Sequence, residues 1–423
     1  MYQLQFTLKQ HTPIIHFQHI KDGATLRATE LKPKLDRFII EKMGGKQKMD
    51  KSWFNDFERG SLNYKMKIIA TDLCQTVIEE GRQSSPPFFF GNMGEEYKKN
   101  KKYLNWSDTP LKLTLTIVNN KSVIFADKLK EYFPEFLLVN NFGTRQNKGW
   151  GSFYLHENTE NYVSYTDIIQ KQNTIKPNSF QYFFDININL KSNDVLSRAT
   201  EALRNLEIFY KAIKSGHNKC FGRDQFYLKP ILWLYYKNVV EKDIKWEKRK
   251  IKEKALSRFL VNQENMYSEA EDSPVTQKGK VELAIKDLLG YTTDEKWSAM
   301  YNNANIAKSM DGIDRYQSPI TFKPILQNNG YKVLVILKDT PELLLNKDIS
   351  FNVNNVDFKM KTPAVFNVNN VFKFIADKSK FNLDNHFLLK INEDSITVSN
   401  YKRDVSINEY RVLQNIFNQL QNR

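Results

Sequence analysis

Residues 140–153 read Asn-Asn-Phe-Gly-Thr-Arg-Gln-Asn-Lys-Gly-Trp-Gly-Ser-Phe, and this segment decides how the N-terminal half is interpreted. Glycine frees a backbone to adopt left-handed conformations and to approach a ligand closely. The three glycines of the segment are Gly143, Gly149 and Gly151. Exposed N–H groups in such a loop form a concave anion site. Arg145 and Lys148 add charge where phosphates would lie, and Trp150 is placed to stack on a base or a sugar.

The position of this segment in the chain separates it from the phosphate loops of nucleotide-binding folds. It follows a predicted amphipathic helix, residues 123–133, and precedes a predicted strand, residues 151–155. Rossmann and Walker loops need a strand first and a helix after, so that the phosphate meets a helix N-terminus. The inverted order argues against a nucleotide, and we predict no cofactor. A flexible connector is the structural alternative.

The rest of the N-terminal half supplies the elements of an open-faced sheet. Alternating residues predict strands, and apolar residues at helical spacing predict helices, the first of them interrupted by Pro33. The predicted strands before the helix at 123–133 are 3–8, 88–90 and 111–117, and the predicted helices are 23–40 and 64–77. The order β-α-(α)-β-β-α-β predicts an antiparallel sheet covered on one face by helices, a ferredoxin-like domain.

The C-terminal half repeats this theme loosely. We predict strands at 184–190 and 331–337, a helix at 195–213 that ends before Gly216, and a terminal helix at 407–420. The fold class is therefore predicted as α+β, with two ferredoxin-like (RRM-like) domains and helical insertions. The predicted boundaries are 1–165 and 166–423.

Composition favours a polyanionic partner. The chain has 423 residues and a net charge of +15, and each phosphate that a cation neutralises releases a counterion. A basic protein from a Lys- and Asn-rich proteome is the alternative. Two cysteines cannot build a disulfide framework, and the N-terminus lacks a signal-peptide pattern. No apolar run approaches the ~20 residues that span a bilayer, so we expect a cytoplasmic protein and no membrane partner.

Residues 237–258 form a basic stretch within the second half. They contain four acidic residues and nine Lys and Arg residues, among them Lys248 and Arg249. A solvated helix face is the ordinary explanation of such a run. The functional alternative is a phosphate-contacting helix inserted in the second domain.

The glycine-rich loop and three further motifs give the chain a family resemblance. A loop of the form G-x-R-x-x-x-G-x-G-S between the second helix and last strand of a ferredoxin-like domain resembles the signature of the RAMP superfamily. Residues 8–15 and 23–32 are similar to the opening strand and first helix of one subfamily, the first RAMP subunit of the type III-B (Cmr) CRISPR effector. Residues 314–324, with Ser318-Pro319, resemble its C-terminal segment.

The resemblance implies a non-catalytic subunit of an antiviral ribonucleoprotein. Its partners would be guide RNA, target RNA and other RAMP subunits. The residues expected to contact RNA, namely cations, glycines and one tryptophan, are Arg27, Lys32, Gly143, Arg145, Lys148, Gly149, Trp150, Gly151, Lys248, Arg249 and Arg315. A scaffold that docks neighbouring subunits through apolar surface is a further alternative.

Catalysis is the alternative from a different class. RAMP subunits that slice RNA use an aspartate after the first strand, where this chain has Asp22, although an Asp-Gly turn explains that residue as well. His16 and His19, beside Arg27, contain the groups that a metal-free ribonuclease needs. The histidine spacing lacks accompanying ligands, and we predict no metal site.

Overall fold

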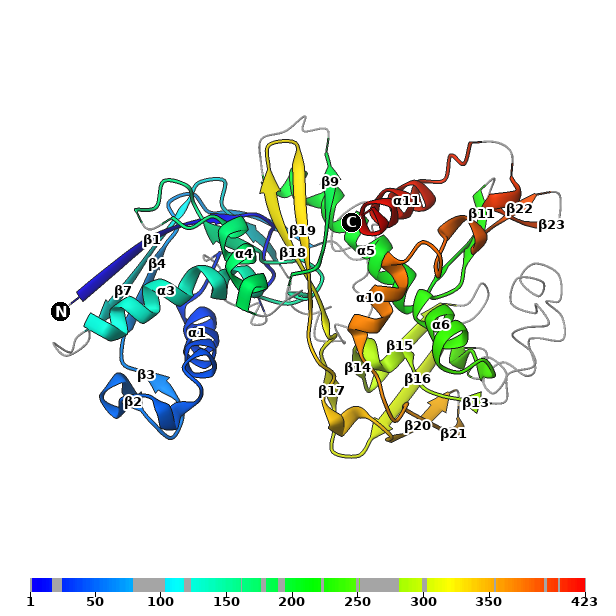
Figure 1. The fold of residues 1–423 in the computed structure, drawn as a ribbon, viewed down its shortest axis with the longest axis horizontal. Coiled ribbons are helices and arrows are strands. Elements are labelled where there is room, and N and C mark those ends of the chain that lie inside the picture. The colour runs from blue at the N-terminus through cyan, green and yellow to red at the C-terminus, as the bar shows by residue number, and fades with distance from the viewer. Residues whose placement is uncertain are drawn as a thin grey trace. The chain divides into compact units, whose positions relative to one another are not determined.

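The structure is a computed structural model, and it describes most of the chain. The described residues are 2–16, 25–78, 103–117, 123–160, 162–175, 180–188, 195–221, 224–248, 251, 281–298, 303–353, 355–391, 394–401 and 404–422. Within them the protein is a mixed α/β chain with several small sheets and seven helices (Figure 1).

The chain divides into two compact units that are discontinuous in sequence. The first unit is Met1–Arg204 with Thr321–Ile336, and the second unit is Asn205–Ile320 with Leu337–Arg423. A two-part layout therefore agrees with the expectation from the sequence. The predicted boundary at 165/166 stays a prediction, because the first unit also contains Thr321–Ile336 and no single position in the sequence divides the two units.

The first unit contains one four-stranded sheet and its helices. The strands of this sheet are β1 (Tyr2–Gln10), β4 (Lys65–Ile69), β7 (Leu111–Ile117) and β8 (Phe153–Leu155). The helices are α1 (Ala28–Lys42), α3 (Val123–Val139) and α4 (Tyr165–Ile175). Two hairpins accompany them, β2 (Phe54–Asp56) with β3 (Ser61–Leu62) and β5 (Cys74–Val77) with β6 (Tyr103–Trp106).

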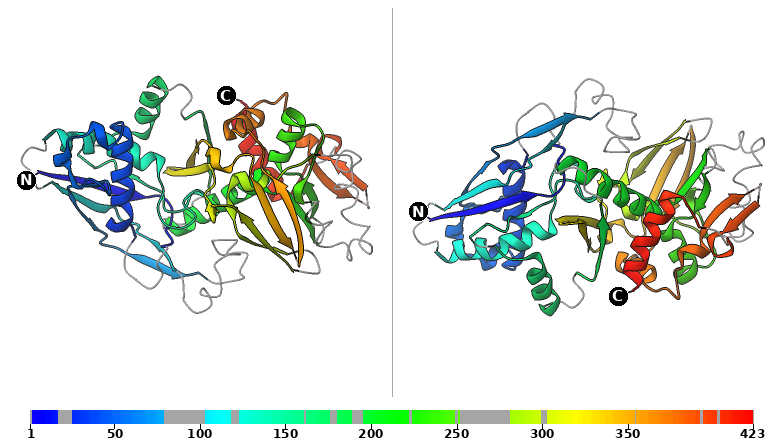
Figure 2. Two further views of the ribbon diagram at one scale, coloured as in Figure 1. Left: turned by 90° about the horizontal axis from the view of Figure 1, so that it is seen from below. Right: turned by 90° about the horizontal axis from the view of Figure 1, so that it is seen from above.

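The sheet has the order β4-β7-β1-β8, and every neighbouring pair is antiparallel. Burial alternates along β7, where Leu111, Leu113 and Leu115 are buried and Lys112 is exposed, so one face points into the core. Helices α1 and α3 cover that face (Figures 1 and 2). Phe6 of β1 and Phe133 of α3 meet in this core with ring centroids 4.5 Å apart.

The predicted helix at 64–77 is wrong. Strands β4 and β5 occupy these residues instead. Lys65, Lys67 and Ile69 are exposed while Met66 and Ile68 pack against the core, which is a period of two. The predicted strand at 88–90 lies outside the described residues.

A second, three-stranded sheet of the first unit joins distant parts of the chain. It has the order β18-β19-β9, with β18 at Ile320–Gln327, β19 at Gly330–Leu337 and β9 at Tyr182–Asn187. The strands predicted at 184–190 and 331–337 are thus confirmed. Val333 and Phe184 pair directly and both are fully buried, so β19 completes the apolar environment of β9.

The second unit contains two four-stranded sheets. One, β10-β11-β22-β23, consists of His217–Phe221, Asp224–Leu228, Phe387–Ile391 and Asp394–Thr397. The other, β15-β16-β20-β21, consists of Asp294–Ser298, Asn303–Met310, Asp348–Val353 and Val356–Lys361. Two short pairs are β12 (Ile244–Lys245) with β13 (Val281–Glu282) and β14 (Tyr291–Thr292) with β17 (Arg315–Tyr316).

The main helices of the C-terminal half follow the sequence patterns. They are α5 (Val195–Lys214), α6 (Ile231–Tyr235), α10 (Val368–Ala376) and α11 (Asn408–Gln421). The helices predicted at 195–213 and 407–420 are confirmed, and Gly216 has the expected positive φ of 71° after α5. The basic stretch 237–258 is a helical turn to Val240, then strand β12, so the predicted helix is wrong over that part. Residues 249–250 and 252–280 lie outside the described residues.

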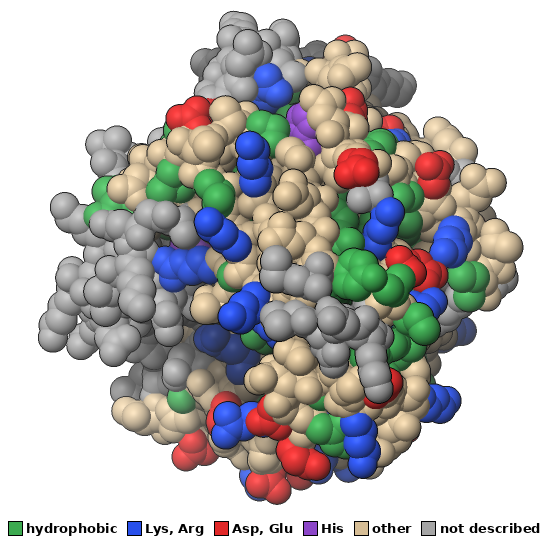
Figure 3. Space-filling view, turned by 90° about the vertical axis from the view of Figure 1, so that its left-hand side faces the viewer, with side chains coloured by type: hydrophobic (Ala, Val, Ile, Leu, Met, Phe, Trp, Pro, Cys, Tyr) green, Lys and Arg blue, Asp and Glu red, His purple; other side chains and the backbone are tan. Residues whose placement is uncertain are grey.

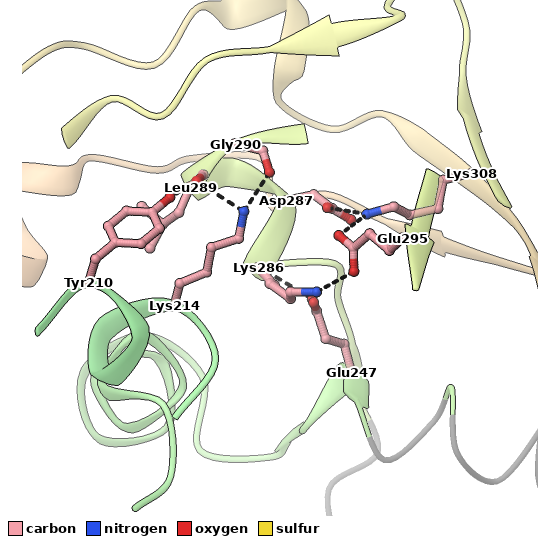
Figure 4. A network of polar contacts seen from close by, with 9 residues as sticks. All are labelled: Tyr210, Lys214, Glu247, Lys286, Asp287, Leu289, Gly290, Glu295 and Lys308. Carbon is pink, nitrogen blue, oxygen red and sulfur yellow. Dashed lines mark hydrogen bonds and ion pairs between the residues drawn. The ribbon is translucent and has the colours of Figure 1, made fainter. Parts of the chain in front are cut away.

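A buried ion cluster fixes the short segment before β14 in the second unit (Figure 4). Lys308 Nζ lies 2.6 Å from Asp287 Oδ1 and 2.7 Å from Glu295 Oε1, and its side chain is 2% exposed. Lys286 Nζ forms an ion pair with Glu295 at 2.5 Å. The carboxylates hold the pKa of Lys308 above its usual range although burial opposes this. Charges taken out of water need such mutual pairing to remain ionised.

Candidate nucleic-acid interface

The glycine-rich loop, residues 140–153, connects α3 to β8 as predicted. Gly151 has φ = 64°, and a Cβ at this position would lie 2.0 Å from the carbonyl oxygen of Phe142. Gly143 has φ = 79°, and a Cβ there would lie 2.5 Å from the carbonyl oxygen of Ile15. No side chain fits such gaps, so these glycines allow the loop to pack against its own protein.

Several backbone amides of this loop are used inside the protein, which argues against the predicted anion cradle at those positions. The Gly143 N–H donates to the carboxylate of Glu30. The Thr144 N–H donates to Ile15 O at 2.7 Å, and the Gly151 N–H donates to Pro13 O at 2.8 Å. These amides are satisfied in the fold and do not point at a ligand.

Strand β18, which is distant in sequence, holds the same loop through hydrogen bonds. The Phe322 N–H donates to Asn147 O at 3.0 Å, and the Asn141 amide donates to Phe322 O at 2.8 Å. Lys323 is fully buried and donates to the carbonyl oxygens of Asn140 and Phe153 at 2.8 and 2.9 Å. Burial lowers the pKa of Lys323 well below its usual value. The loop is therefore stiff.

Sequence reasoning missed Lys323 as a structural residue. Its only signal in the sequence is a single lysine within the otherwise apolar strand β18. A lysine on a buried strand must find carbonyl partners, and here those partners lie in the glycine-rich loop.

The side chains of the loop differ in what they offer to a ligand. Trp150 is 2% exposed, so its indole has no free face and the predicted stacking role is wrong in this conformation. Gly149 is buried too, and its carbonyl accepts a 2.7 Å hydrogen bond from Thr12. Arg145 and Lys148 are half-buried, on the part of the loop that keeps contact with solvent.

The predicted cations of α1 also differ. Arg27 is half-buried at the N-terminal boundary of α1. Lys32 donates to Asp36 at 2.7 Å and to Leu62 O at 2.9 Å, and its ammonium lies 4.3 Å from the ring centroid of Tyr64. Lys32 thus ties α1 to the β2–β3 hairpin, which explains its presence without RNA.

Three predicted cations belong to the second unit. Lys248 is half-buried, and Arg315 is exposed on β17, where it pairs with Thr292. Arg249 lies outside the described residues. Because the two units are described separately, none of these cations is assigned to the surface of the glycine-rich loop.

Of the three candidate catalytic residues, only His16 lies in the described part of the chain. Asp22 and His19 lie outside the described residues. His16 is buried, as is His11, whose Nδ1 accepts a hydrogen bond from the Leu326 N–H at 3.1 Å. Burial lowers the pKa of His11 well below its usual value, and Lys323 adds to this effect.

The described residues also bear on metals and membranes. Among them, no group of three or more His, Cys, Asp or Glu side chains is placed to hold a metal ion. Every helix in the described ranges is too short or too polar to cross a bilayer.

Surface charge is uneven on the face drawn in Figure 3. Left of the centre of this view several Lys and Arg side chains lie near one another, whereas in its upper, lower and right-hand parts Lys and Arg lie among Asp and Glu. Such local clustering of one sign favours an anionic partner more than the net charge alone does.

Comparison with known proteins gives a family match for each half of the chain. A structure described as "Cryo-EM structure of the Type III-B Cmr-beta bound to cognate target RNA" has a chain 10% identical to this one, with a TM-score of 0.36 over 79% of this chain and 94% of that chain. No curated protein matches. The family model of the Cmr1 N-terminal domain matches residues 1–217, and that of the Cmr1 C-terminal domain matches residues 227–402. The chain therefore belongs to the Cmr1 family of RAMP proteins.

Proposed function

We propose that the protein is a non-catalytic, RNA-binding subunit of a type III-B CRISPR effector ribonucleoprotein. It contacts the backbone of guide RNA or target RNA and works in the cytoplasm beside other RAMP subunits. The two family matches, which follow one another along the chain, support a subunit of this kind. The net charge of +15 supports a polyanionic partner.

The observation that carries RNA contact is the charge on the rigid glycine-rich loop. Residues 144–148 are the half-exposed part of the loop, and they include Arg145 and Lys148. Residues 140–153 contain no Asp or Glu. Since Glu30 and main-chain carbonyls occupy several of the loop amides, the contact is made by cationic side chains held on a fixed backbone. A fixed cation loses little conformational freedom when it binds a phosphate.

The fold supports the same proposal. The order β-α-β-β-α-β with the sheet β8-β1-β7-β4 is the arrangement of a ferredoxin-like domain, and we propose that description for the N-terminal part of the first unit. The remaining strands are distributed over two four-stranded sheets, one three-stranded sheet and several two-stranded pairs, so a second such domain is a proposal on the resemblance alone.

We propose that the protein lacks catalytic activity because the two described histidines after β1 are buried. His11 and His16 are 3% and 6% exposed. A general base must come within hydrogen-bonding distance of the proton that it removes, which a buried imidazole cannot do without local opening.

A salt titration of RNA binding tests the proposed contact. Arg145→Ala with Lys148→Ala should weaken binding to all RNA sequences alike by about 10-fold and reduce the slope of log affinity against log salt by about 1.4, or ~0.7 for each lost phosphate contact. The matched control is Lys48→Ala with Lys130→Ala, which removes two exposed cations of the same unit. Loss of affinity for one sequence only would contradict backbone recognition.

An RNA cleavage assay separates binding from catalysis. The purified protein should leave labelled repeat and target RNA intact, with and without magnesium. Site-specific cleavage that disappears in Asp22→Ala or His16→Ala would replace the binding proposal by an endoribonuclease.

A further inference from the structure

The outward face of the four-stranded sheet has a charge pattern that the family resemblance does not explain. Met66 and Ile68 of β4 and Leu113 of β7 point into the core, so the residues between them point outward. Helices α1 and α3 lie on the inward side (Figures 1 and 2). Within the described residues, the outward side chains of β4 and β7 are exposed or half-buried, whereas Tyr154 of β8, which lies opposite Lys9, is buried.

Four lysines form a diagonal on this face, which we call the lysine stripe: Lys65, Lys67, Lys112 and Lys9. The strand register defines successive rows two residues apart. Lys65 lies opposite Thr116, Lys67 lies opposite Thr114, and Ile69 lies opposite Lys112.

The stripe continues onto β1 by the same register. Thr7 lies opposite Lys112, so Lys9 belongs to the next row. Each lysine is therefore one row further along while the stripe passes from β4 through β7 to β1. Rows two residues apart are separated by about 7 Å, and diagonal neighbours by about 7–8 Å. This spacing is comparable with the distance between successive phosphates in an extended single strand.

The described residues of these three strands give the stripe no counter-charge. Lys65, Lys67 and Lys112 are exposed, Lys9 is half-buried, and none of the four forms an ion pair within the described residues. The other outward positions of these three strands are Gln3, Gln5, Thr7, Ile69, Thr114 and Thr116, with no Asp or Glu. Thr and Gln can donate to and accept from ribose hydroxyls.

Protection of a sheet edge does not account for the pattern. Lysines on edge strands commonly prevent sheets from pairing with one another, and β4 is an edge strand. Lys112 and Lys9, however, lie on β7 and β1, which are both interior strands. Like charges on neighbouring interior strands repel one another, so an anion bound along them would relieve that repulsion.

The stripe also ends beside the glycine-rich loop. Lys9 is its last row, and Thr12 and Pro13 follow on the same segment. Thr12 Oγ1 donates to Gly149 O at 2.7 Å, and Pro13 O accepts from the Gly151 N–H. One strand of nucleic acid could pass from the loop onto the sheet without leaving the first unit.

We propose that the lysine stripe is a second RNA-binding site, which holds the sugar–phosphate backbone of a single-stranded RNA that continues from the glycine-rich loop. This inference rests on the proposed function and adds to it a path across the sheet. A stripe one lysine wide on a sheet face suits a single strand, because none of the described elements of this face rises from it to enter the groove of a duplex. Four lysines correspond to about four phosphates along a path of about 20 Å.

Fluorescence anisotropy with a fluorescein-labelled polyuridine RNA tests the stripe in the full-length protein. The variant Lys9→Gln, Lys65→Gln, Lys67→Gln, Lys112→Gln should bind at least about 10-fold more weakly and lower the salt slope by up to ~3. The control Lys347→Gln, Lys359→Gln, Lys373→Gln, Lys378→Gln removes the same charge from exposed positions of the second unit. Lysine-to-arginine changes at the four stripe positions should restore binding.

The outcomes separate this inference from the function on which it rests. If the stripe variant binds like the control while Arg145→Ala with Lys148→Ala binds more weakly, the stripe proposal is overturned and the proposed function stands. If the wild-type protein binds no RNA at low salt, both fall. A stripe variant that binds RNA normally but fails to join the other subunits would assign this face to an acidic protein and overturn the RNA proposal.

Chemical footprinting gives a second readout that needs no substitution. Acetylation of the wild-type protein, followed by mass spectrometry, should show Lys65, Lys67 and Lys112 protected when the RNA is bound. Lys347 and Lys359 should react equally with and without RNA. Equal reactivity of the stripe lysines in both states would contradict the proposal.

Discussion

Gly151 shows how a single residue decides the geometry of the glycine-rich loop. Its φ of 64° lies in the left-handed region, and the space where a side chain would begin is occupied by the main chain of Phe142. The backbone clash, added to the strain of the left-handed conformation, excludes a residue with a Cβ at this position. The loop therefore depends on glycine for its packing rather than for contact with a ligand.

Replacing Gly151 tests this interpretation at the scale of one residue. Gly151→Ala should destabilise the protein by more than about 2 kcal/mol, because the left-handed strain adds to a backbone clash. Gly45→Ala is the matched control, since Gly45 has φ = 103° and open space around its Cα, and it should cost about 1 kcal/mol. Urea unfolding measures both. Equal losses of stability would show that the clash at Gly151 is relieved by a small shift.

Burial of other loop residues could not be predicted from the local sequence. The location of residues 140–153 between a helix and a strand follows from short-range periodicity, and that prediction is confirmed. Whether Trp150 faces solvent depends on contacts that neighbouring residues do not reveal. Asn141 and Phe322, for example, form their hydrogen bond across 181 residues of sequence.

At the scale of elements, the ion cluster before β14 contains a carboxyl group, that of Glu247, whose protonation can be tested. Glu247 is 3% exposed and accepts a hydrogen bond from the Lys286 N–H at 3.0 Å. Burial and the neighbouring Asp287 raise the pKa of Glu247 to about 8, although Lys286 and Lys308 act in the opposite direction. The folded protein therefore holds a proton that the unfolded chain releases near pH 4.5.

This difference predicts how stability changes with pH. Since the pKa of Glu247 is raised in the folded state, its contribution is complete below about pH 4.5 and is lost as the pH rises to about 8. Glu247→Gln keeps the acceptor for Lys286 but cannot ionise, so the free energy of unfolding should fall less steeply between pH 5 and 8, by up to about 1.4 kcal/mol per pH unit. Glu342→Gln, at an exposed position, should leave the slope unchanged. Parallel curves for Glu247→Gln and wild type would exclude an uncharged Glu247.

The elements themselves were predictable where one periodicity dominated. The patterns of β7, α5 and α11 are long and regular, and the structure confirms them. The prediction of a helix at 64–77 failed because Tyr64, Ile68, Leu73 and Val77 happen to match helical spacing. Pairing of β4 with β7 instead stabilises a strand there. Sheet pairing is a long-range interaction and has no local signature.

At the scale of the whole molecule, the position of Thr321–Ile336 in the first unit predicts how fragments of the chain behave. A fragment 1–217 ends where the first family match ends, but it lacks β18 and β19. It should be protease-sensitive and lose cooperative thermal unfolding, because β9 and the glycine-rich loop lose their partners. Residues 1–204 joined by a flexible linker to residues 321–336 should regain both properties. A stable fragment 1–217 would show that these strands are dispensable.

The same arrangement has a consequence for synthesis in the cell. During translation the first 204 residues leave the ribosome well before Thr321–Ile336 exist, so β9 emerges without β19 and Asn140 without the side-chain nitrogen of Lys323. The nascent chain must hold an open, apolar strand edge while more than a hundred further residues are added. We expect the rate of elongation through that interval to influence how much of the chain reaches its native form.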